Sequence, residues 1–363
     1  MYFNPVKIVK TDRWLIDLKD ELKKNNCNSS LIVCSIGTIK RLNLFNIFNE
    51  KRIFSHFSEN PSLVDSNHLL MFLKGKTFDS VVAIGGGSSM DIAKVAMASL
   101  STSSYNLTDL IASRCAYHHK IFSVFIPTTH GTASEVTMWG TIWDKENKKK
   151  LSISNKNLYP VIAIIDPSLT LELPLHISIS TILDALSHSF EAIWNKNSNK
   201  KSTAYAIDSI CKILNNIDKF KADTRNLKIR EIFCEASVLA GLAFSNTKTA
   251  ACHSISYPLS MHFNIPHGIA ASMTINSVLT FNQNAIENEL TLINRRLGLS
   301  NLELKDSISN IPKSIIPFNL SGWGVSPDDI QFLANESFTK GRMDNNIVKI
   351  TIEDVKNFLS EIL

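Results

Sequence analysis

A chain of 363 residues with 44% hydrophobic and 20% charged residues can bury the cores of two ordinary domains, which excludes a wholly disordered protein. The net charge of +5 is modest, and the basic runs are short and carry no interleaved aromatic residues, so no nucleic-acid partner is expected. No apolar run approaches the roughly 20 residues of a membrane helix, and the first residues lack a signal-peptide pattern, so we expect a soluble, cytoplasmic protein without a membrane partner.

The first 166 residues alternate short apolar runs with helical or turn-rich segments. The runs are rich in β-branched residues and are bounded by Gly, Pro and Thr, which predicts strands buried on both faces of a parallel sheet. Residues 137–154 alternate around a charged turn and predict a β-hairpin. The expected strands of the sheet are residues 31–35, 80–87, 121–129 and 161–166.

The second of these strands runs directly into a glycine turn. The letters VVAI are followed by GGGSS, and the next residues, MDIAKVAMA, have helical spacing. A strand, a glycine turn and a helix start together direct free backbone N–H groups at a pyrophosphate. The spacing is not GxGxxG, because position 90 is Met, and a turn of purely structural purpose is the alternative.

The pattern of apolar residues changes at about Pro167, from short runs to helical spacing. Residues 180–194 and 233–244 have the apolar spacing of amphipathic helices, and no strand pattern follows. The sequence therefore predicts an α/β dinucleotide-binding domain over residues 1–168 and an all-α domain over residues 169–363. Small ligands usually bind in the cleft of such a pair.

Four residues of the second half form a candidate metal site. Asp184 and His188 are four positions apart, which places both on one face of a helix. An Asp–His hydrogen bond is the alternative for this pair alone. His253 lies in an expected helix and His267 follows a proline; three imidazoles and one carboxylate suit iron or zinc. His262 is a weaker candidate that the spacing does not exclude.

Three segments together resemble the iron-containing (group III) alcohol dehydrogenases, over essentially the whole chain. They are GGGSSMDIAK, PTTHGTASEVT, and DALSHSFEA with HSISYPLSMHFNIPHG. The resemblance implies the two-domain fold shared with dehydroquinate synthase, a nicotinamide cofactor and a homodimer. It also implies Fe(II), with zinc as the alternative, held by Asp184, His188, His253 and His267, whereas His262 matches no ligand.

The resemblance further implies where the cofactor binds. Its pyrophosphate is expected at Gly86, Gly87 and Ser88, and Asp91 completes the motif. The threonines of PTTHGT, Thr128 and Thr129, are expected on the adenine side of the cofactor. Thr137 and Lys150 are expected near its nicotinamide half.

The residue after the first expected strand bears on the choice between NADH and NADPH. NAD-specific members of the family have an aspartate there that accepts the ribose 2′-hydroxyl, but this chain has Ser35. Without the carboxylate a 2′-phosphate is not repelled, and Thr38, Lys40 and Arg41 offer further donors to it. We therefore predict NADPH over NADH.

The chain departs from the family at three positions. Many members have a histidine four residues beyond the first late metal ligand, where this chain has Tyr257. A phenol, whose ordinary pKa is about 10, donates a proton better than it accepts one at neutral pH, so Tyr257 as the catalytic group favours aldehyde reduction; a water molecule is the alternative relay. His130 replaces a usual Ala and Ile182 a common Gly, and both are expected to reshape the pocket.

Three further stretches resemble the branch of phosphonoacetaldehyde reductases, which make 2-hydroxyethylphosphonate. They are AFSNTKTAACHSISYP, IWDKENKKK and GRMDNNIV. A phosphonate dianion needs cationic partners, for which Lys248 and Arg342 are the candidates; solvated surface charges are the alternative. We therefore expect the partner to be a small, anionic aldehyde.

Rival functions differ from this one in testable ways. Another small aldehyde would use the same site. A sugar-phosphate cyclase of the dehydroquinate-synthase type shares the fold but typically uses a Glu and two His as metal ligands, and would consume no NAD(P)H. A silent binding protein is disfavoured, because every expected metal ligand is present.

Overall fold

The computed structural model describes residues 2–363, which divide into two compact units. The N-terminal unit consists of residues 5–129 and 133–170, and the helical unit consists of residues 2–4, 130–132 and 171–363. The α/β and all-α fold classes expected from the sequence are thus both present. Within residues 2–363, no helix combines the length and the apolar character needed to cross a lipid bilayer.

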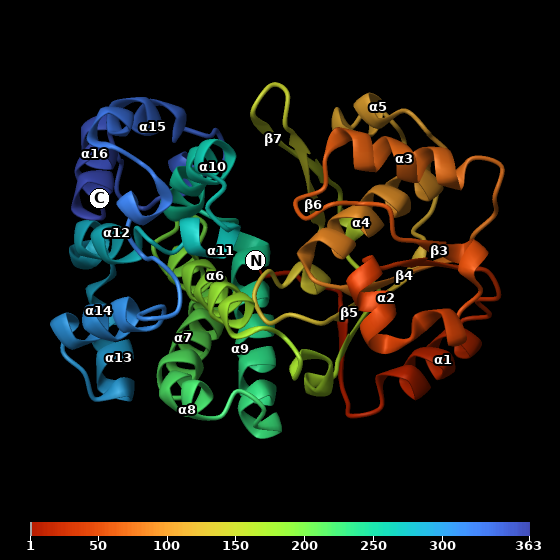
Figure 1. Ribbon diagram of the computed structural model, residues 1–363, viewed down its shortest axis with the longest axis horizontal. Helices are drawn as coiled ribbons and strands as arrows, with labels where there is room; N and C mark the ends of the chain where they lie inside the picture. The colour runs from red at the N-terminus through yellow and green to blue at the C-terminus, as the bar shows by residue number, and fades with distance from the viewer. Residues whose placement is uncertain (1) are drawn as a thin grey trace. The chain divides into compact units, whose positions relative to one another are not determined.

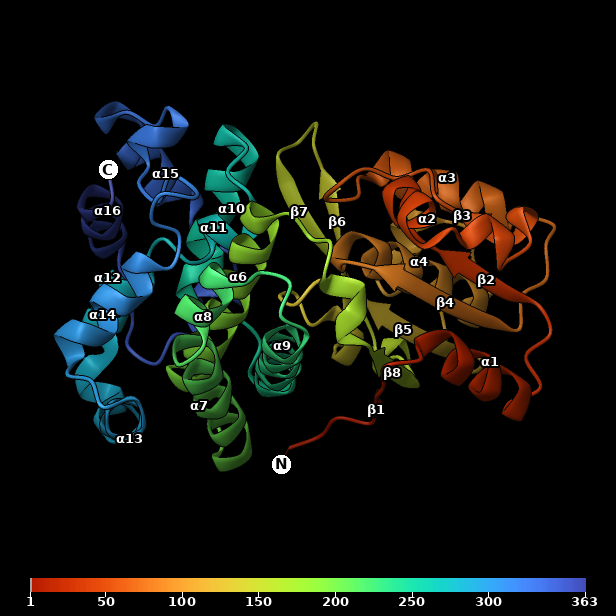
Figure 2. The ribbon, with the colours of Figure 1, turned by 60° about the horizontal axis from the view of Figure 1, so that its bottom comes forward.

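Six parallel strands form the sheet of the N-terminal unit, in the order β1-β8-β5-β4-β2-β3 (Figure 2). The four expected strands are confirmed, with shorter bounds. The sequence does not predict the edge strands β1 and β3, because β1 has a lysine at each end and so lacks a continuous apolar run, and β3 has only two residues. The strands are β1 (Lys7–Lys10), β2 (Ser30–Val33), β3 (Ile53–Phe54), β4 (Ser80–Gly85), β5 (Phe122–Pro127) and β8 (Ile162–Ile165).

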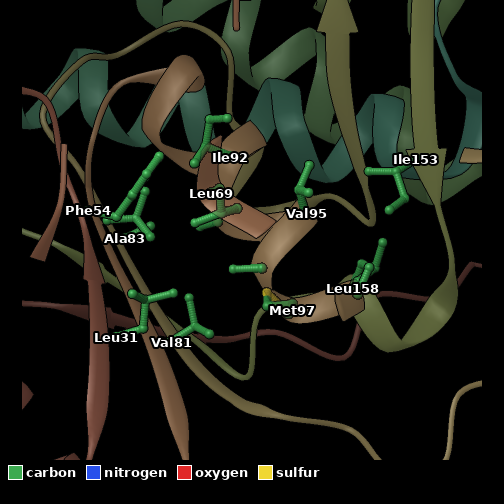
Figure 3. Packing of buried hydrophobic residues seen from close by; sticks show 14 of the residues in the cluster. Leu31, Phe54, Leu69, Val81, Ala83, Ile92, Val95, Met97, Ile153 and Leu158 are labelled. Carbon is green, nitrogen blue, oxygen red and sulfur yellow. The ribbon is translucent and has the colours of Figure 1, made fainter. Parts of the chain in front are cut away.

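Successive residues of the central strands enter two different cores. Val81 and Ala83 belong to one buried cluster, and Val82 and Ile84 belong to the other. Because side chains alternate across a strand, the two clusters lie on opposite faces of the sheet. Figure 3 shows the first cluster, in which strand residues such as Leu31 pack with side chains of helix α4 (Gly87–Thr102). This burial on both faces explains why the strands read as continuous apolar runs.

Helices and a hairpin complete the N-terminal unit. The hairpin is confirmed: β6 (Trp139–Asp144) pairs antiparallel with β7 (Lys149–Ser154). The helices besides α4 are α1 (Trp14–Lys24), α2 (Ile36–Leu42), α3 (Leu63–Leu73) and α5 (Leu107–Ile111). Short 3₁₀ helices are η1 (Leu44–Asn46), η2 (Glu50–Arg52), η3 (Ser134–Val136), η4 (Lys156–Leu158) and η5 (Pro167–Thr170).

The helical unit is built around three long helices, α6 (Leu175–Ile193), α7 (Lys200–Leu214) and α9 (Leu227–Thr247), which pack against one another (Figure 1). Every residue of α6 from Ile182 to Ile193 is buried, so this helix forms the centre of the unit. The other helices are α8 (Ile217–Ala222), α10 (Ala251–Phe263), α11 (His267–Ala270), α12 (Ile275–Asn282), α13 (Glu287–Leu297), α14 (Asn301–Asn310), α15 (Ile330–Glu336) and α16 (Ile352–Glu361). Its 3₁₀ helices are η6 (Gln283–Ile286), η7 (Ser321–Trp323), η8 (Pro327–Asp329) and η9 (Met343–Asn345).

Candidate active site

Asp184 and His188 of α6 and His253 of α10 come together inside the helical unit. One potential ligand atom from each lies within 4.8 Å of the others, and all three residues are buried. Asp184 Oδ1 is 3.9 Å from His188 Nδ1 and 3.5 Å from His253 Nε2. The helical spacing of Asp184 and His188 thus produces the shared face that the sequence predicts.

Ring stacking holds the imidazole of His188 in place. Its ring lies 4.0 Å from that of Phe244, almost parallel at 6°, and 4.4 Å from that of His253 at 22°. Because Phe244 is on α9 and His253 on α10, the stack joins three helices. The orientation of His188 is therefore fixed by packing.

His267 is the first residue of α11. Its ring centroid is 5.3 Å from that of His253, although its nitrogens lie outside the 4.8 Å cluster. Gly268 allows α11 to lie against α6, because a Cβ at that position would be 2.1 Å from the carbonyl oxygen of Ser180. His267 stays the predicted fourth ligand. His262, in contrast, packs edge-on against the ring of Phe332, with centroids 4.8 Å apart.

The electrostatics and the hydrogen bonding of this cluster fit a divalent cation. Burial alone would raise the pKa of Asp184, but the charges of His188, His253 and His267 outweigh it and lower that pKa. Burial likewise opposes the charge of His253, but the carboxylates of Glu191 and Asp184 raise its pKa to about 9. Asp184 Oδ1 and His253 Nε2 are both buried and make no hydrogen bond of normal geometry within residues 2–363. A cation between them would satisfy both atoms.

Glu191, which the sequence reasoning missed, lies behind this cluster. It is on α6, three residues after His188, and its carboxylate is fully buried. Both of its oxygens accept hydrogen bonds from His253. The signal available in the sequence was a second acidic residue in DALSHSFEA, seven positions after Asp184 and so on the helix face of Asp184 and His188.

Tyr257, the predicted proton donor, lies one turn beyond His253 on α10 and is half-buried. Its hydroxyl accepts a hydrogen bond from Nε of Arg342, at 3.3 Å. The structure therefore brings together two predicted site residues that are 85 positions apart in the chain.

The backbone next to Lys248 is joined to the segment that carries Arg342. Asn345 donates hydrogen bonds to the carbonyl oxygens of Thr249, at 2.8 Å, and of Gly341, at 2.9 Å, and so joins the segments that carry Lys248 and Arg342. Lys248 itself is exposed and caps α9 with a positive φ of 64°. Of the two predicted cations, Arg342 is hydrogen-bonded to Tyr257 and Lys248 lies at the surface.

The predicted phosphate cradle has the expected form in the N-terminal unit. Helix α4 begins at Gly87, directly after the end of β4, and Gly86 is its N-cap residue. Gly85 has a φ of +151°, and a Cβ there would be 2.3 Å from Ser89 Oγ, so glycine is required. The first-turn N–H groups of this 16-residue helix, which carries Ser88 and Asp91, are available to an anion.

The remaining cofactor residues flank this cradle or tie it to the unit. Thr129 contacts Gly86, since a Cβ on that glycine would be 3.2 Å from its side chain, and Thr128 directly follows β5 and is buried. Ser35 caps α2, where its Oγ accepts from the backbone N of Thr38, at 3.2 Å. Lys40 is exposed, and the ammonium of Lys150 lies 5.3 Å from the ring centre of Trp143.

Lys94, which the sequence reasoning also missed, organises the segment after the threonines. Its ammonium is fully buried and donates to Thr137 Oγ1, at 2.9 Å, to Ser134 and to the carbonyl oxygen of Trp139. Burial lowers the pKa of Lys94 and raises that of the nearby Asp91. The Thr137 hydroxyl therefore binds within the protein, which is a structural role beside its predicted contact with the cofactor.

His130 lies in the core of the helical unit. Its Nε2 is 3.1 Å from Nη1 of Arg230, its Nδ1 is 3.3 Å from Thr181 Oγ1, and its ring packs against Phe220 and Phe233. The side chain is 1% exposed. The structure makes His130 a neutral partner of a buried arginine, and its effect on a pocket stays a prediction.

Two family models cover nearly the whole chain. The model of iron-containing alcohol dehydrogenase matches residues 5–167, and the model of the C-terminal part of the Fe-containing alcohol dehydrogenase family matches residues 178–363. Alcohol dehydrogenase 4 of Saccharomyces cerevisiae is 30% identical over 309 residues, which are 84% of this chain and 81% of the yeast protein. The NAD-dependent methanol dehydrogenase of Bacillus methanolicus is 28% identical over 322 residues, covering 86% and 84% of the two chains.

A solved structure extends the likeness to the fold. The crystal structure of sulfoacetaldehyde reductase from Bifidobacterium kashiwanohense in complex with NAD+ matches with a TM-score of 0.91 and 26% identity, covering 100% of this chain and 98% of that one. These matches favour an oxidoreductase over a sugar-phosphate cyclase. The chain belongs to the iron-containing alcohol dehydrogenase family.

Proposed function

We propose that the protein is a metal-dependent reductase of a small anionic aldehyde, with NADPH as the preferred reductant and phosphonoacetaldehyde as the predicted substrate. The observation that carries the proposal is the pairing of Tyr257 with Arg342, one helical turn from His253. The similarity to a sulfoacetaldehyde reductase supports an anionic aldehyde, and makes sulfoacetaldehyde the second substrate to test.

The donor set of the cluster suits the chemistry of this family. When bound by Asp184, His188, His253 and His267, a divalent cation supplies Lewis-acid polarisation of the carbonyl group, and a reduced nicotinamide supplies the hydride for its carbon. Fe(II) is the proposed ion and zinc the alternative, because imidazole and carboxylate ligands suit both. The protein itself must then hold the aldehyde and provide one proton.

Tyr257 is the proposed source of that proton. A phenol oxygen that accepts a hydrogen bond from Arg342 keeps its own proton to donate, and the alkoxide oxygen formed by hydride addition would receive it. The guanidinium then stabilises the phenolate left behind, since an adjacent positive charge favours the charged form of an acid. A proton from solvent restores the phenol and completes the balance.

Arg342 is the proposed partner of the substrate's anionic group. Its Nε donates to Tyr257 and its Nη1 donates to the carbonyl oxygen of Gly341, which fixes the plane of the guanidinium. A guanidinium has five N–H donors, so further donors can bind a phosphonate or sulfonate. Lys248, on the adjacent segment, adds a second positive charge at the surface.

The test compares anionic and neutral aldehydes. Metal-loaded enzyme should reduce phosphonoacetaldehyde or sulfoacetaldehyde with a higher kcat/KM than propanal, with NADPH oxidation as the measurement. Arg342→Gln should lower kcat/KM for the anionic aldehydes about 10- to 100-fold more than for propanal, because a hydrogen bond to a charged group contributes about 1.5–3 kcal/mol.

The exposed Lys340 provides the matched control. Lys340→Gln removes the same charge two residues away and should leave the ratio of anionic to neutral efficiencies unchanged. Equal losses for propanal and the anionic aldehydes in Arg342→Gln would contradict the role of Arg342. A preference of the wild-type enzyme for propanal would contradict the proposed substrate class.

A further inference from the structure

The carboxylate of Glu191 is fully buried and contacts the metal cluster at His253. Asp184, His188 and Glu191 occupy positions i, i+4 and i+7 of α6, so they follow one face of that helix. The first two supply candidate ligands. Glu191 instead accepts hydrogen bonds from His253, at Oε1 from the backbone N–H (3.0 Å) and at Oε2 from Nδ1 (2.5 Å).

The backbone half of this contact follows from the start of α10. His253 is the third residue of that helix, and an N–H in the first turn has no partner within its own helix. Glu191 supplies the missing acceptor from α6, and the partial positive charge of the helix start stabilises its carboxylate. One side chain thus holds both the backbone and the ring of His253.

Two donors converge on Glu191, so its side chain must offer two acceptors. A carboxylate does so; an amide of the same shape has one acceptor and one donor, and while Nδ1 is protonated it would place a donor against a donor in either orientation. When the ring is neutral and its one proton is held on Nδ1, the unprotonated nitrogen is Nε2, which lies 3.5 Å from Asp184 Oδ1. Nε2 is the nitrogen that a cation in this cluster needs as a lone-pair donor.

We infer that Glu191 is a positioning residue that fixes the tautomer and the ring orientation of His253 for metal binding. The inference rests on the proposed metal centre, and it concerns a residue outside the predicted ligand set. A histidine ligand whose other nitrogen donates to a carboxylate is held in one orientation and is a stronger base toward the metal. Loss of such a partner typically weakens metal affinity about 10- to 100-fold.

The test is the metal affinity of Glu191→Gln, measured by competition with a chromophoric chelator for Zn²⁺ and Fe²⁺. We expect a 10- to 100-fold loss of affinity, with an unchanged circular dichroism spectrum. The matched control is Glu235→Gln, which makes the same substitution at the surface, where the carboxylate pairs with Lys212 at 2.8 Å. This control should bind metal as the wild type does.

A second readout separates positioning from general stability. In protein labelled with ¹⁵N-histidine, the Nδ1–H of His253 should give a strongly downfield proton signal, because it donates to a buried carboxylate. The signal should disappear in Glu191→Gln and in a His253→Gln assignment variant. If Glu191→Gln fails to fold, Glu191→Asp takes its place; it keeps an ionised acceptor, and should keep the signal at a shifted position while weakening metal binding.

The outcomes distinguish this inference from the proposed function. A Glu191→Gln protein that binds metal like Glu235→Gln and keeps the downfield signal would overturn the inference, whatever the enzyme reduces. Metal binding that depends on Glu191, in a protein that reduces no aldehyde, would support the inference and overturn the proposed function. A wild type without metal affinity would overturn both.

Discussion

Ser35 performs a structural task that an acidic residue could also perform. Its hydroxyl caps α2 by accepting from the backbone N of Thr38, and it lies two residues beyond the end of β2. Asp and Asn are as good as Ser at an N-cap, so the choice among them is decided by what they present to the cofactor.

The substitution Ser35→Asp should therefore leave the fold intact and reverse the cofactor preference. A carboxylate at this position repels a 2′-phosphate and accepts hydrogen bonds from a free ribose hydroxyl. We expect the ratio of kcat/KM with NADPH to that with NADH to fall at least about tenfold, since one unit charge near another in a partly buried site is worth about 1.4 kcal/mol or more. Steady-state kinetics with both cofactors measure the ratio.

Ser35→Asn is the control for this prediction, because it keeps the cap without adding a charge. It should preserve the wild-type ratio. A wild-type enzyme that uses NADH as well as NADPH would refute the preference itself, and an unchanged ratio in Ser35→Asp would show that position 35 does not contact the ribose.

At the scale of single residues, the sequence predicts which residue types could form the site, but few of the contacts between them. The spacing of Asp184 and His188 predicts their shared face, because both lie in one helix. The contact of Tyr257 with Arg342 and that of Glu191 with His253 join segments 85 and 62 positions apart, which no local pattern encodes. The buried role of Lys94 is not predictable from the sequence for a related reason, since a lysine in a helix is normally solvated.

At the scale of elements, the metal cluster depends on how closely α11 approaches α6. The start of α11 is packed so tightly that Gly268 has no room for a methyl group beside Ser180. The obstacle is a backbone carbonyl of a buried helix, which cannot turn away as a side chain would.

Gly268→Ala should consequently displace α11 and the adjacent His267. We expect a destabilisation of about 1–3 kcal/mol, the usual cost of overpacking, together with a weaker retention of metal. Thermal unfolding of the metal-free protein and metal content after dialysis against a chelator measure the two effects.

Gly37→Ala is the control for this prediction, because it makes the same substitution in a helix that has space for the added methyl group. A Cβ at Gly37 would meet nothing closer than Ser35 Oγ, at 3.9 Å, so this change should be neutral or slightly stabilising. Full stability together with full metal retention in Gly268→Ala would show that the close approach of α11 is not needed.

Elements buried on two faces were predictable, whereas edges and boundaries were not. Central strands such as β4 and β5 are apolar except for one serine each, which produces a strong signal. The edge strand β1 has a lysine at each end, and β3 has two residues. Helix α4 begins at Gly87, within the glycine run, because a residue without a side chain can still take helical φ and ψ angles.

At the scale of the whole molecule, the buried pair of His130 and Arg230 makes stability depend on pH. Burial, reinforced by the charge of Arg230, lowers the pKa of His130 to about 3, against an ordinary value of about 6.5. Above pH 6.5 the residue is neutral in both the folded and the unfolded chain and contributes no pH dependence. Between these pKa values only the unfolded chain binds the proton, so stability falls as the pH falls.

The expected slope from this single group is about 1.4 kcal/mol per pH unit over that window. Denaturant unfolding of the helical unit at several pH values from 7 down to about 5 measures it, and His130→Gln should remove this component, because glutamine does not titrate. His176→Gln, at an exposed position, should keep the wild-type slope. Parallel curves for wild type and His130→Gln would contradict the low pKa of His130.

The long-range pairing of the N-terminal residues has a consequence for the order of folding during synthesis. Within residues 2–363, strand β1 pairs with β8, so Ile8 can pair with Ala163 only after Ala163 has been synthesised. The residues before β1 wait longer, because the Tyr2 hydroxyl donates to the carbonyl oxygen of Leu242 and the backbone N of Phe3 donates to Asn246. At about 5–20 residues per second this delay is roughly 10–50 s. Residues 2–10 therefore leave the ribosome well before their partners and are placed late, and chaperones have that interval in which to bind them.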